Sequence, residues 1–119
     1  MTRAAAALQA VRAGYGAALL LVPGRVIRVC TGSQAGSRTR TAARVLGARH
    51  LAQAAVTVGS GPSAESLGLG AAVDITHAAS MAVLALADRR VRRVTLTDAL
   101  IETAFAAAGL SSAVPPRAS

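Results

Sequence analysis

Four long apolar segments alternate with short polar stretches along the chain. They occupy about residues 4–22, 41–58, 65–87 and 94–110. The strong breaker pair Pro23-Gly24 ends the first segment, and Gly59-Ser60-Gly61-Pro62 ends the second. Alanine abundance and segment length favour helix over strand. The pattern therefore predicts an all-α fold of four helices, each with roughly the 17 to 21 residues that cross the hydrocarbon core of a bilayer.

The stretches between these segments are short, so we expect a single four-helix membrane domain over residues 1–110. The longest connection follows Pro23 and is expected to be a basic linker that contains Arg25, Arg28, Arg38 and Arg40. Residues 111–119 include Pro115-Pro116 and are predicted to form a disordered tail.

Composition points towards lipid. Of the 119 residues 53% are hydrophobic and 15% charged, whereas soluble domains carry about a quarter charged residues. Tyr15 and Phe105 are the only aromatic residues, so a soluble core would lack its usual large side chains. Helices that approach closely in a membrane can instead be built from small residues.

The basic residues, all of them arginines, gather in alternate connections. The first connection carries four arginines, the third carries Arg89, Arg90, Arg92 and Arg93, and the second, at residues 59–66, carries none. In a four-span protein the first and third connections share a side, and the positive-inside rule makes that side cytoplasmic, with both termini outside. We expect the third cluster to face anionic lipid headgroups at the cell membrane. Nucleic acid is not an expected partner, because no aromatic platforms accompany these arginines.

Small residues recur at four-residue spacing in three segments, which predicts close helix contacts in lipid. The three stripes are Ala6, Ala10, Gly14 and Ala18; Gly68, Ala72, Thr76 and Ser80; and Ala99, Thr103 and Ala107.

Ionisable residues interrupt all four segments, and charge-free runs of roughly 10 to 14 residues are also typical of soluble core helices. A soluble helical partner-binding module therefore remains an alternative. In a membrane these residues must pair or line a cavity. The predicted buried polar cluster contains Arg12, Arg49, His50, Asp74, His77, Asp98 and Glu102.

Helix rise gives the depth of each member of the cluster, and depth predicts the pairs. Arg49 is expected to meet Glu102 or Asp98, and Arg12 to meet Asp74 or His77. The cluster serves either to hold the bundle together or as a proton or small-ion relay, since histidine titrates near neutral pH.

No spacing typical of a metal site is present, and no nucleophile stands beside a base, so neither a cofactor nor an enzyme is expected. Haem held between His50 and His77 is one alternative, and a lipid-binding transport site is another. We favour a small non-enzymatic membrane protein, an accessory or structural subunit that associates with other membrane subunits or with itself.

The order of features over most of the chain resembles that of a known group. It begins with Arg12 and Gly14 in the first segment and continues with Pro23, Gly24 and Arg25. The run Arg44-Val45-Leu46-Gly47-Ala48-Arg49-His50-Leu51 looks like the Arg-x-x-Gly-x-Arg-x-Leu signature of small actinobacterial multi-span membrane proteins, the DUF4267-like group. Asp74 with His77 looks like the polar pair in that group's third helix. That group has no assigned function, so the resemblance implies architecture alone. His50 stands where an acidic residue is expected, so this chain departs from the pattern there.

Overall fold

The computed structural model describes residues 2–61 and 63–113, which form five α-helices, one short 3-10 helix and no strand. The elements are α1 (Arg3–Leu21), α2 (Pro23–Thr31), α3 (Ser37–Gly59), α4 (Ala64–Ala87), η1 (Arg89–Val91) and α5 (Arg92–Ala113). The prediction of an all-helical chain is confirmed, and each of the four predicted segments lies within a helix apart from its residues at the ends.

Local sequence signals set the helix ends. The Thr2 side chain accepts a hydrogen bond from the Ala5 N–H at the start of α1. At the start of α4, Ser63 and Ser66 form a capping box, in which each side chain accepts from the other's backbone N–H. Gly32 ends α2 with a φ of 70°, a left-handed conformation that suits glycine.

Two predictions about the connections are wrong. The stretch expected to be a basic linker contains α2, because Pro23 occupies the first turn of a new helix, where its missing N–H costs nothing. Residues 111–113, expected to belong to a disordered tail, are helical instead, because α5 continues to Ala113. The remainder of that predicted tail, residues 114–119, lies outside the described residues.

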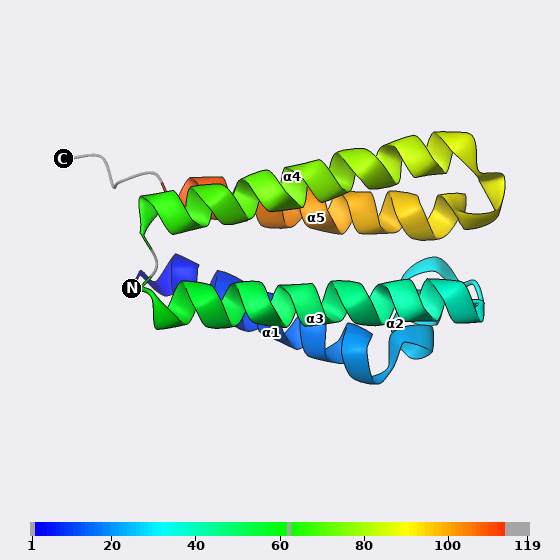
Figure 1. The fold of residues 1–119 in the computed structure, drawn as a ribbon, viewed down its shortest axis with the longest axis horizontal. Coiled ribbons are helices and arrows are strands. Elements are labelled where there is room, and N and C mark those ends of the chain that lie inside the picture. The colour runs from blue at the N-terminus through cyan, green and yellow to red at the C-terminus, as the bar shows by residue number, and fades with distance from the viewer. Residues whose placement is uncertain (1, 62, 114–119) are drawn as a thin grey trace.

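The helices form two layers. Figure 1 shows α4 and α5 side by side in one layer, and α1, α2 and α3 in the other. Contacts are dense between α4 and α5 and between α1 and α3, whereas α3 and α4 touch at few positions. We call α1–α3 the first half and α4–α5 the second half. The two halves therefore meet along a thin interface.

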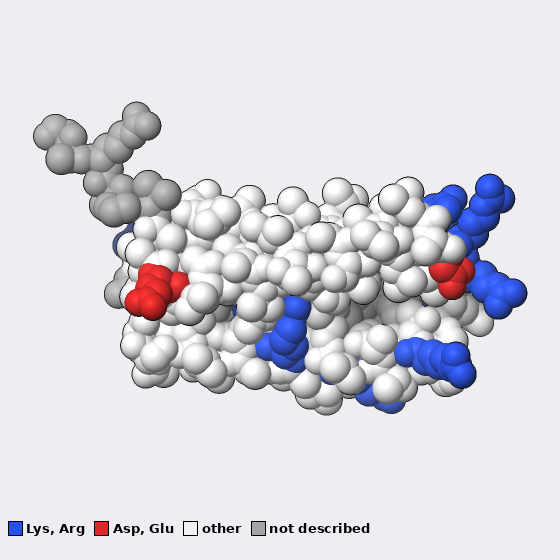
Figure 2. Space-filling model, turned by 45° about the horizontal axis from the view of Figure 1, so that its top comes forward, with Lys and Arg blue, Asp and Glu red and all other residues white. Residues whose placement is uncertain are grey.

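The two apolar clusters of the core lie towards opposite ends of this interface. One contains Ala5, Leu8, Leu67 and Phe105, and the other contains Leu19, Ile27 and Ala43. Between them the interior is polar. The arginines of both long connections gather at one end of the molecule, as Figure 2 shows, and Glu65 lies at the opposite end, which we call the termini end.

Within residues 2–61 and 63–113, three helical stretches are long and apolar enough to cross a membrane: Arg3–Leu21, Ala64–Ala87 and Arg89–Ala113. α3 has the length but carries four arginines, at positions 38, 40, 44 and 49, and does not meet that composition.

The predicted small-residue stripes do not make the helix contacts. Gly14, Ala72, Thr76 and Thr103 are exposed, and nothing lies within 4 Å of the place of a Gly14 Cβ. The close approach of α1 is two residues further on, at Gly16, which packs against Gly47 of α3. Alanine occurs on every face of these helices, so spacing alone did not identify the packed face.

Candidate functional site

An ion pair between α1 and α4 lies at the centre of the molecule. Arg12 Nη1 donates to Asp74 Oδ1 at 2.9 Å, and Arg12 Nη2 donates to Asp74 Oδ2 at 2.5 Å. The arginine is 3% exposed and the aspartate is fully buried. Two parallel hydrogen bonds of this kind fix the relative position of both side chains and join the two halves of the molecule.

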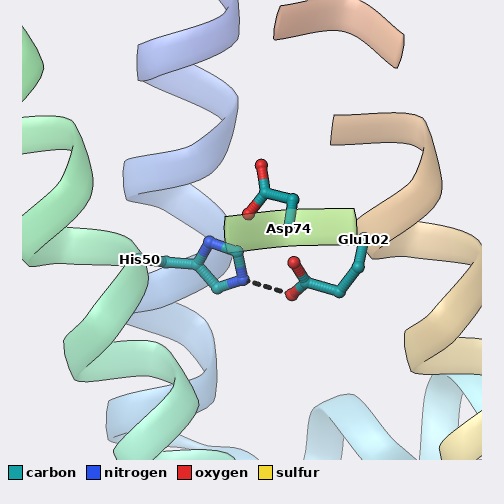
Figure 3. Close-up of side chains that lie close together, drawn as sticks. All are labelled: His50, Asp74 and Glu102. Atoms are coloured by element: carbon teal, nitrogen blue, oxygen red, sulfur yellow. Dashed lines mark hydrogen bonds and ion pairs between the residues drawn. The ribbon is translucent and has the colours of Figure 1, made fainter. Parts of the chain in front are cut away.

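His50 of α3 lies between Arg12 and Glu102 of α5 and forms a hydrogen bond with each of them. Arg12 Nη1 lies 3.1 Å from His50 Nδ1, and His50 Nε2 lies 2.6 Å from Glu102 Oε1 (Figure 3). Two guanidiniums approach the imidazole: Arg12 at Nδ1, and Arg49, whose Nη2 lies 3.4 Å from Nε2. A guanidinium can only donate, so the shorter contact, at 3.1 Å, makes Nδ1 the accepting nitrogen. The single proton of a neutral imidazole is then on Nε2, which donates it to Glu102.

Arg49, also on α3, closes the arrangement into a ring. Its Nη2 donates to Glu102 Oε2 at 2.8 Å and lies 3.6 Å from Asp74 Oδ1. We call the five residues Arg12, Arg49, His50, Asp74 and Glu102 the polar ring. With His50 neutral, two guanidiniums balance two carboxylates, and the ring carries no net charge.

The charges of the ring are divided between the halves. Both guanidiniums belong to the first half, and both carboxylates belong to the second. Buried ion pairs of this kind contribute little net stability, but removing one partner leaves a buried charge uncompensated and typically costs about 3–5 kcal/mol.

A second polar group, the dyad, consists of His77 and Asp98. His77 Nε2 lies 2.6 Å from Asp98 Oδ2, and the Tyr15 hydroxyl donates to Asp98 Oδ1 over a long 3.4 Å. Ligand atoms of His77, Asp98 and Glu102 all lie within 4.8 Å of one another, so the dyad borders the polar ring.

The sequence analysis left two possible partners for each buried arginine, and the structure selects one of the two in each case. Arg12 meets Asp74 and Arg49 meets Glu102, while His77 pairs with Asp98 on the neighbouring helix. Arg49 and His77 are only partly buried; the other five members of the predicted cluster are buried. Sequence analysis missed Tyr15 as a member, although it lies three residues after Arg12 on the same helix face.

The donor geometry bears on metal and haem. His50, Asp74 and Glu102 have ligand atoms within 4.8 Å of one another. Two guanidiniums already neutralise these carboxylates, so a divalent cation would add charge beside Arg12 and Arg49. Both imidazole nitrogens of His50 take part in hydrogen bonds within the polar ring. Haem ligation by His50 would therefore require one of these two hydrogen bonds to break.

A cavity lies on each side of the polar groups along the bundle. The arginine-end cavity has a volume of about 280 Å³; Tyr15, His77 and Asp98 line it together with aliphatic side chains. The termini-end cavity has a volume of about 360 Å³, and Gln9, Arg12, Arg49 and Gln53 are among its lining residues. Four buried polar atoms have no partner among the described residues, and all belong to this lining: Gln9 Oε1, Arg49 Nε, and Gln53 Oε1 and Nε2.

The predicted headgroup-facing arginines differ from one another. Arg89, Arg90 and Arg93 are exposed, whereas Arg92 is half-buried and its Nε donates to the Ala85 carbonyl at 2.8 Å. Arg92 thus binds a free carbonyl in the last turn of α4.

Comparison with known proteins adds no further identification: no family model, curated protein or solved structure matches the chain.

Proposed function

We propose that the chain is a non-catalytic integral membrane protein that crosses the cell membrane four times, with both termini outside. The supporting observation is the inversion of its surface and its interior. Arg12, Asp74 and Glu102 are buried, whereas Leu21, Leu86 and Leu100 are 74%, 82% and 73% exposed. In water this arrangement would be unfavourable for two reasons: the exposed leucines would be in contact with water, and the charged side chains would have lost their hydration. Hydrocarbon around the bundle removes the cost of the exposed leucines, and it makes the interior, where the charges are paired, the favourable place for the ionisable side chains.

Exposed hydroxyl groups along the helices support the same proposal. Thr76, Ser80 and Thr103 each donate to the carbonyl four residues earlier, at 2.8, 2.9 and 2.7 Å. Water would satisfy an exposed hydroxyl without this bond, whereas in hydrocarbon the helix itself must supply the acceptor.

Our proposal makes α3 the fourth span in spite of its arginines. Arg38, Arg40 and Arg44 lie in its first third, near the arginine end, where long side chains can reach the headgroups. Arg49 is compensated by Glu102. The positive-inside rule then places the arginine end in the cytoplasm, with anionic headgroups as its contacts. Kinship with the DUF4267-like group is part of this proposal and rests on the motif in α3.

The role we propose is that of an accessory or structural subunit. The small-residue stripe on α4, from Gly68 to Ser80, is half-buried at its first residue and exposed at the other three, so most of it is free for a helix of another subunit or a second copy. The polar ring then serves to hold the two halves in register rather than to carry out a reaction.

Alkaline carbonate extraction tests the membrane location. The protein should stay in the pellet, and release into the supernatant would end the four-span proposal and favour the soluble module.

The single cysteine tests the orientation. Cys30 is exposed at the arginine end. A membrane-impermeant maleimide should label it in inside-out vesicles and leave it unlabelled in intact cells. A Cys30→Ser, Ser60→Cys variant moves the thiol to the other end and should give the opposite result.

A proton or small-ion relay is the second candidate, favoured by the two cavities that flank the polar groups. The unpaired amides of Gln9 and Gln53 would hold water beside Arg49 on one side. The dyad adjoins the cavity on the other side. Asp98→Asn and His77→Ala should abolish proton flux into vesicles if the relay operates, and unchanged flux would exclude it.

A further inference from the structure

The arginine-end cavity has the construction of a ligand site. Its walls are aliphatic, and Leu19, Leu46, Met81 and Ile101 are among the side chains that form them. Its volume of about 280 Å³ approaches that of pockets that hold small organic ligands.

Four threonines line the cavity, and the hydroxyls of Thr31, Thr95 and Thr97 already donate to carbonyls of the helices. The polar groups that adjoin the polar ring are few and adjacent. The dyad of His77 and Asp98 lines it together with the Tyr15 hydroxyl, whose bond to Asp98 is long at 3.4 Å. The bond to Asp98 uses Nε2 of His77, and Nδ1 has no hydrogen-bond partner among the described residues. Nδ1 of His77 can therefore form a hydrogen bond with one polar group of a ligand. It donates when it carries a proton and accepts when it does not.

The opening of the cavity lies between the two halves of the molecule. Exposed lining residues come from the first half, at Cys30 of α2 and at Arg38 and Ala42 of α3, and from the second half, at Leu84 of α4. Helices α3 and α4 touch at few positions. Figure 2 shows the surface hollowed between the layers in the half nearer the arginines. If the helices span the membrane as proposed, this opening faces the acyl chains of one leaflet. A ligand would then enter laterally from the bilayer.

We propose that this cavity binds a neutral, lipid-soluble molecule with an apolar body and one hydroxyl or carbonyl group. The apolar walls take the body, and the dyad takes the polar group. A charged headgroup is disfavoured because the interior of the cavity offers no uncompensated cation, since the polar ring is neutral and Arg38 lies at the exposed rim. The ligand source is the membrane, so this inference rests on the proposed function for its supply but not for its binding.

Tyr15 provides the measurement, because it is the only tyrosine, the chain has no tryptophan, and the residue lines the cavity. The purified full chain in mild detergent is titrated with menadione, a quinone that quenches tyrosine emission on contact, and N-acetyltyrosinamide in the same micelles corrects for absorption. We expect saturable quenching at a low mole fraction of menadione in the detergent.

Two matched variants locate the site. Ala42→Phe fills the arginine-end cavity and should weaken binding by about tenfold or more, the equivalent of one lost binding contact. Ala52→Phe makes the same change ten residues later on α3, in the lining of the termini-end cavity, and should bind as the original chain does. Both alanines are exposed, so both variants should fold. Quenching that is unaffected by Ala42→Phe would overturn the site.

Competition against menadione defines the ligand class. Decan-1-ol should displace it about tenfold more effectively than n-decane, because only the alcohol can bond to the dyad. This preference should disappear in His77→Leu. Equal displacement by the alcohol and the alkane in the original chain, or stronger displacement by decanoate than by decan-1-ol, would overturn the proposed chemistry. Loss of binding in detergent leaves the carbonate result unchanged, so failure of this site and failure of the membrane proposal can be told apart.

Discussion

Gly16 and Gly47 bring the backbones of α1 and α3 into direct contact. A Cβ added to Gly47 would lie 2.5 Å from the Gly16 carbonyl oxygen, and one added to Gly16 would lie 2.8 Å from the Gly47 carbonyl oxygen. The contact is one helical turn from Arg12 and directly precedes Arg49 and His50. The spacing of α1 and α3 at this point therefore controls the geometry of the polar ring.

Substitution of Gly47 by alanine should loosen this contact. We expect Gly47→Ala to lower the free energy of unfolding by about 1–3 kcal/mol, because the added methyl group meets backbone atoms that cannot move aside. Gly14→Ala is the control, since nothing lies within 4 Å of its Cβ and alanine favours helix; it should be neutral or stabilising by up to about 1 kcal/mol. Unfolding in mixed micelles measures both. Equal stability of the two variants would contradict the proposed contact.

Breaking the central ion pair should cost more than removing it entirely. Arg12→Met and Asp74→Leu each leave one buried charge unpaired, and each should destabilise by about 3–5 kcal/mol. The double variant should lose much less than the sum of the two. A double-mutant cycle in micelles checks this, and additive losses would show that the two side chains do not interact.

The hydrogen bonds of the polar ring predict the tautomer of His50. Its Nε2 should carry the proton and its Nδ1 should not, because Nδ1 accepts from Arg12. Nitrogen-15 NMR of labelled histidine distinguishes the two forms, and His77→Gln assigns the resonances, since the chain has two histidines. A protonated Nδ1 would mean that Arg12 does not bond to His50.

Arg92 and Arg90 should differ in their effect on stability although they are two residues apart. Arg92→Gln removes the bond to the Ala85 carbonyl and should lower the free energy of unfolding by about 1 kcal/mol. Arg90→Gln changes an exposed side chain and should stay within about 0.5 kcal/mol of the original. Thermal unfolding in detergent compares the two, and a larger loss for Arg90→Gln would contradict the capping role of Arg92.

Sequence reasoning succeeded where a signal was local or where depth restricted the partners. The third segment was predicted from residue 65, after the breaker run that ends at Pro62, and α4 begins at Ala64. Helix rise restricted Arg12 to Asp74 or His77 and Arg49 to Glu102 or Asp98, and the structure has Asp74 and Glu102 as the partners.

The failures arise where the sequence carries no local signal, and the first of them concerns rotation about the helix axis. Where alanine lies on all sides of a helix, spacing gives no preferred face, so Gly14 was chosen instead of Gly16. α2 was missed because Pro23 both ends one helix and begins the next. The two cavities depend on how the halves separate around the polar groups, and no local pattern encodes that separation.

The division of charge in the polar ring has a consequence for biosynthesis. In a chain inserted as proposed, Arg12 and Arg49 would lie in the bilayer without counter-ions when only α1–α3 has left the ribosome; α4 and α5 would supply both carboxylates later. The nascent chain thus passes through an electrostatically incomplete intermediate, in which the first half must delay full insertion or tilt its guanidiniums towards the surface. Two fragments cut at the second connection, expressed together, should rescue one another, and the first fragment alone should be degraded.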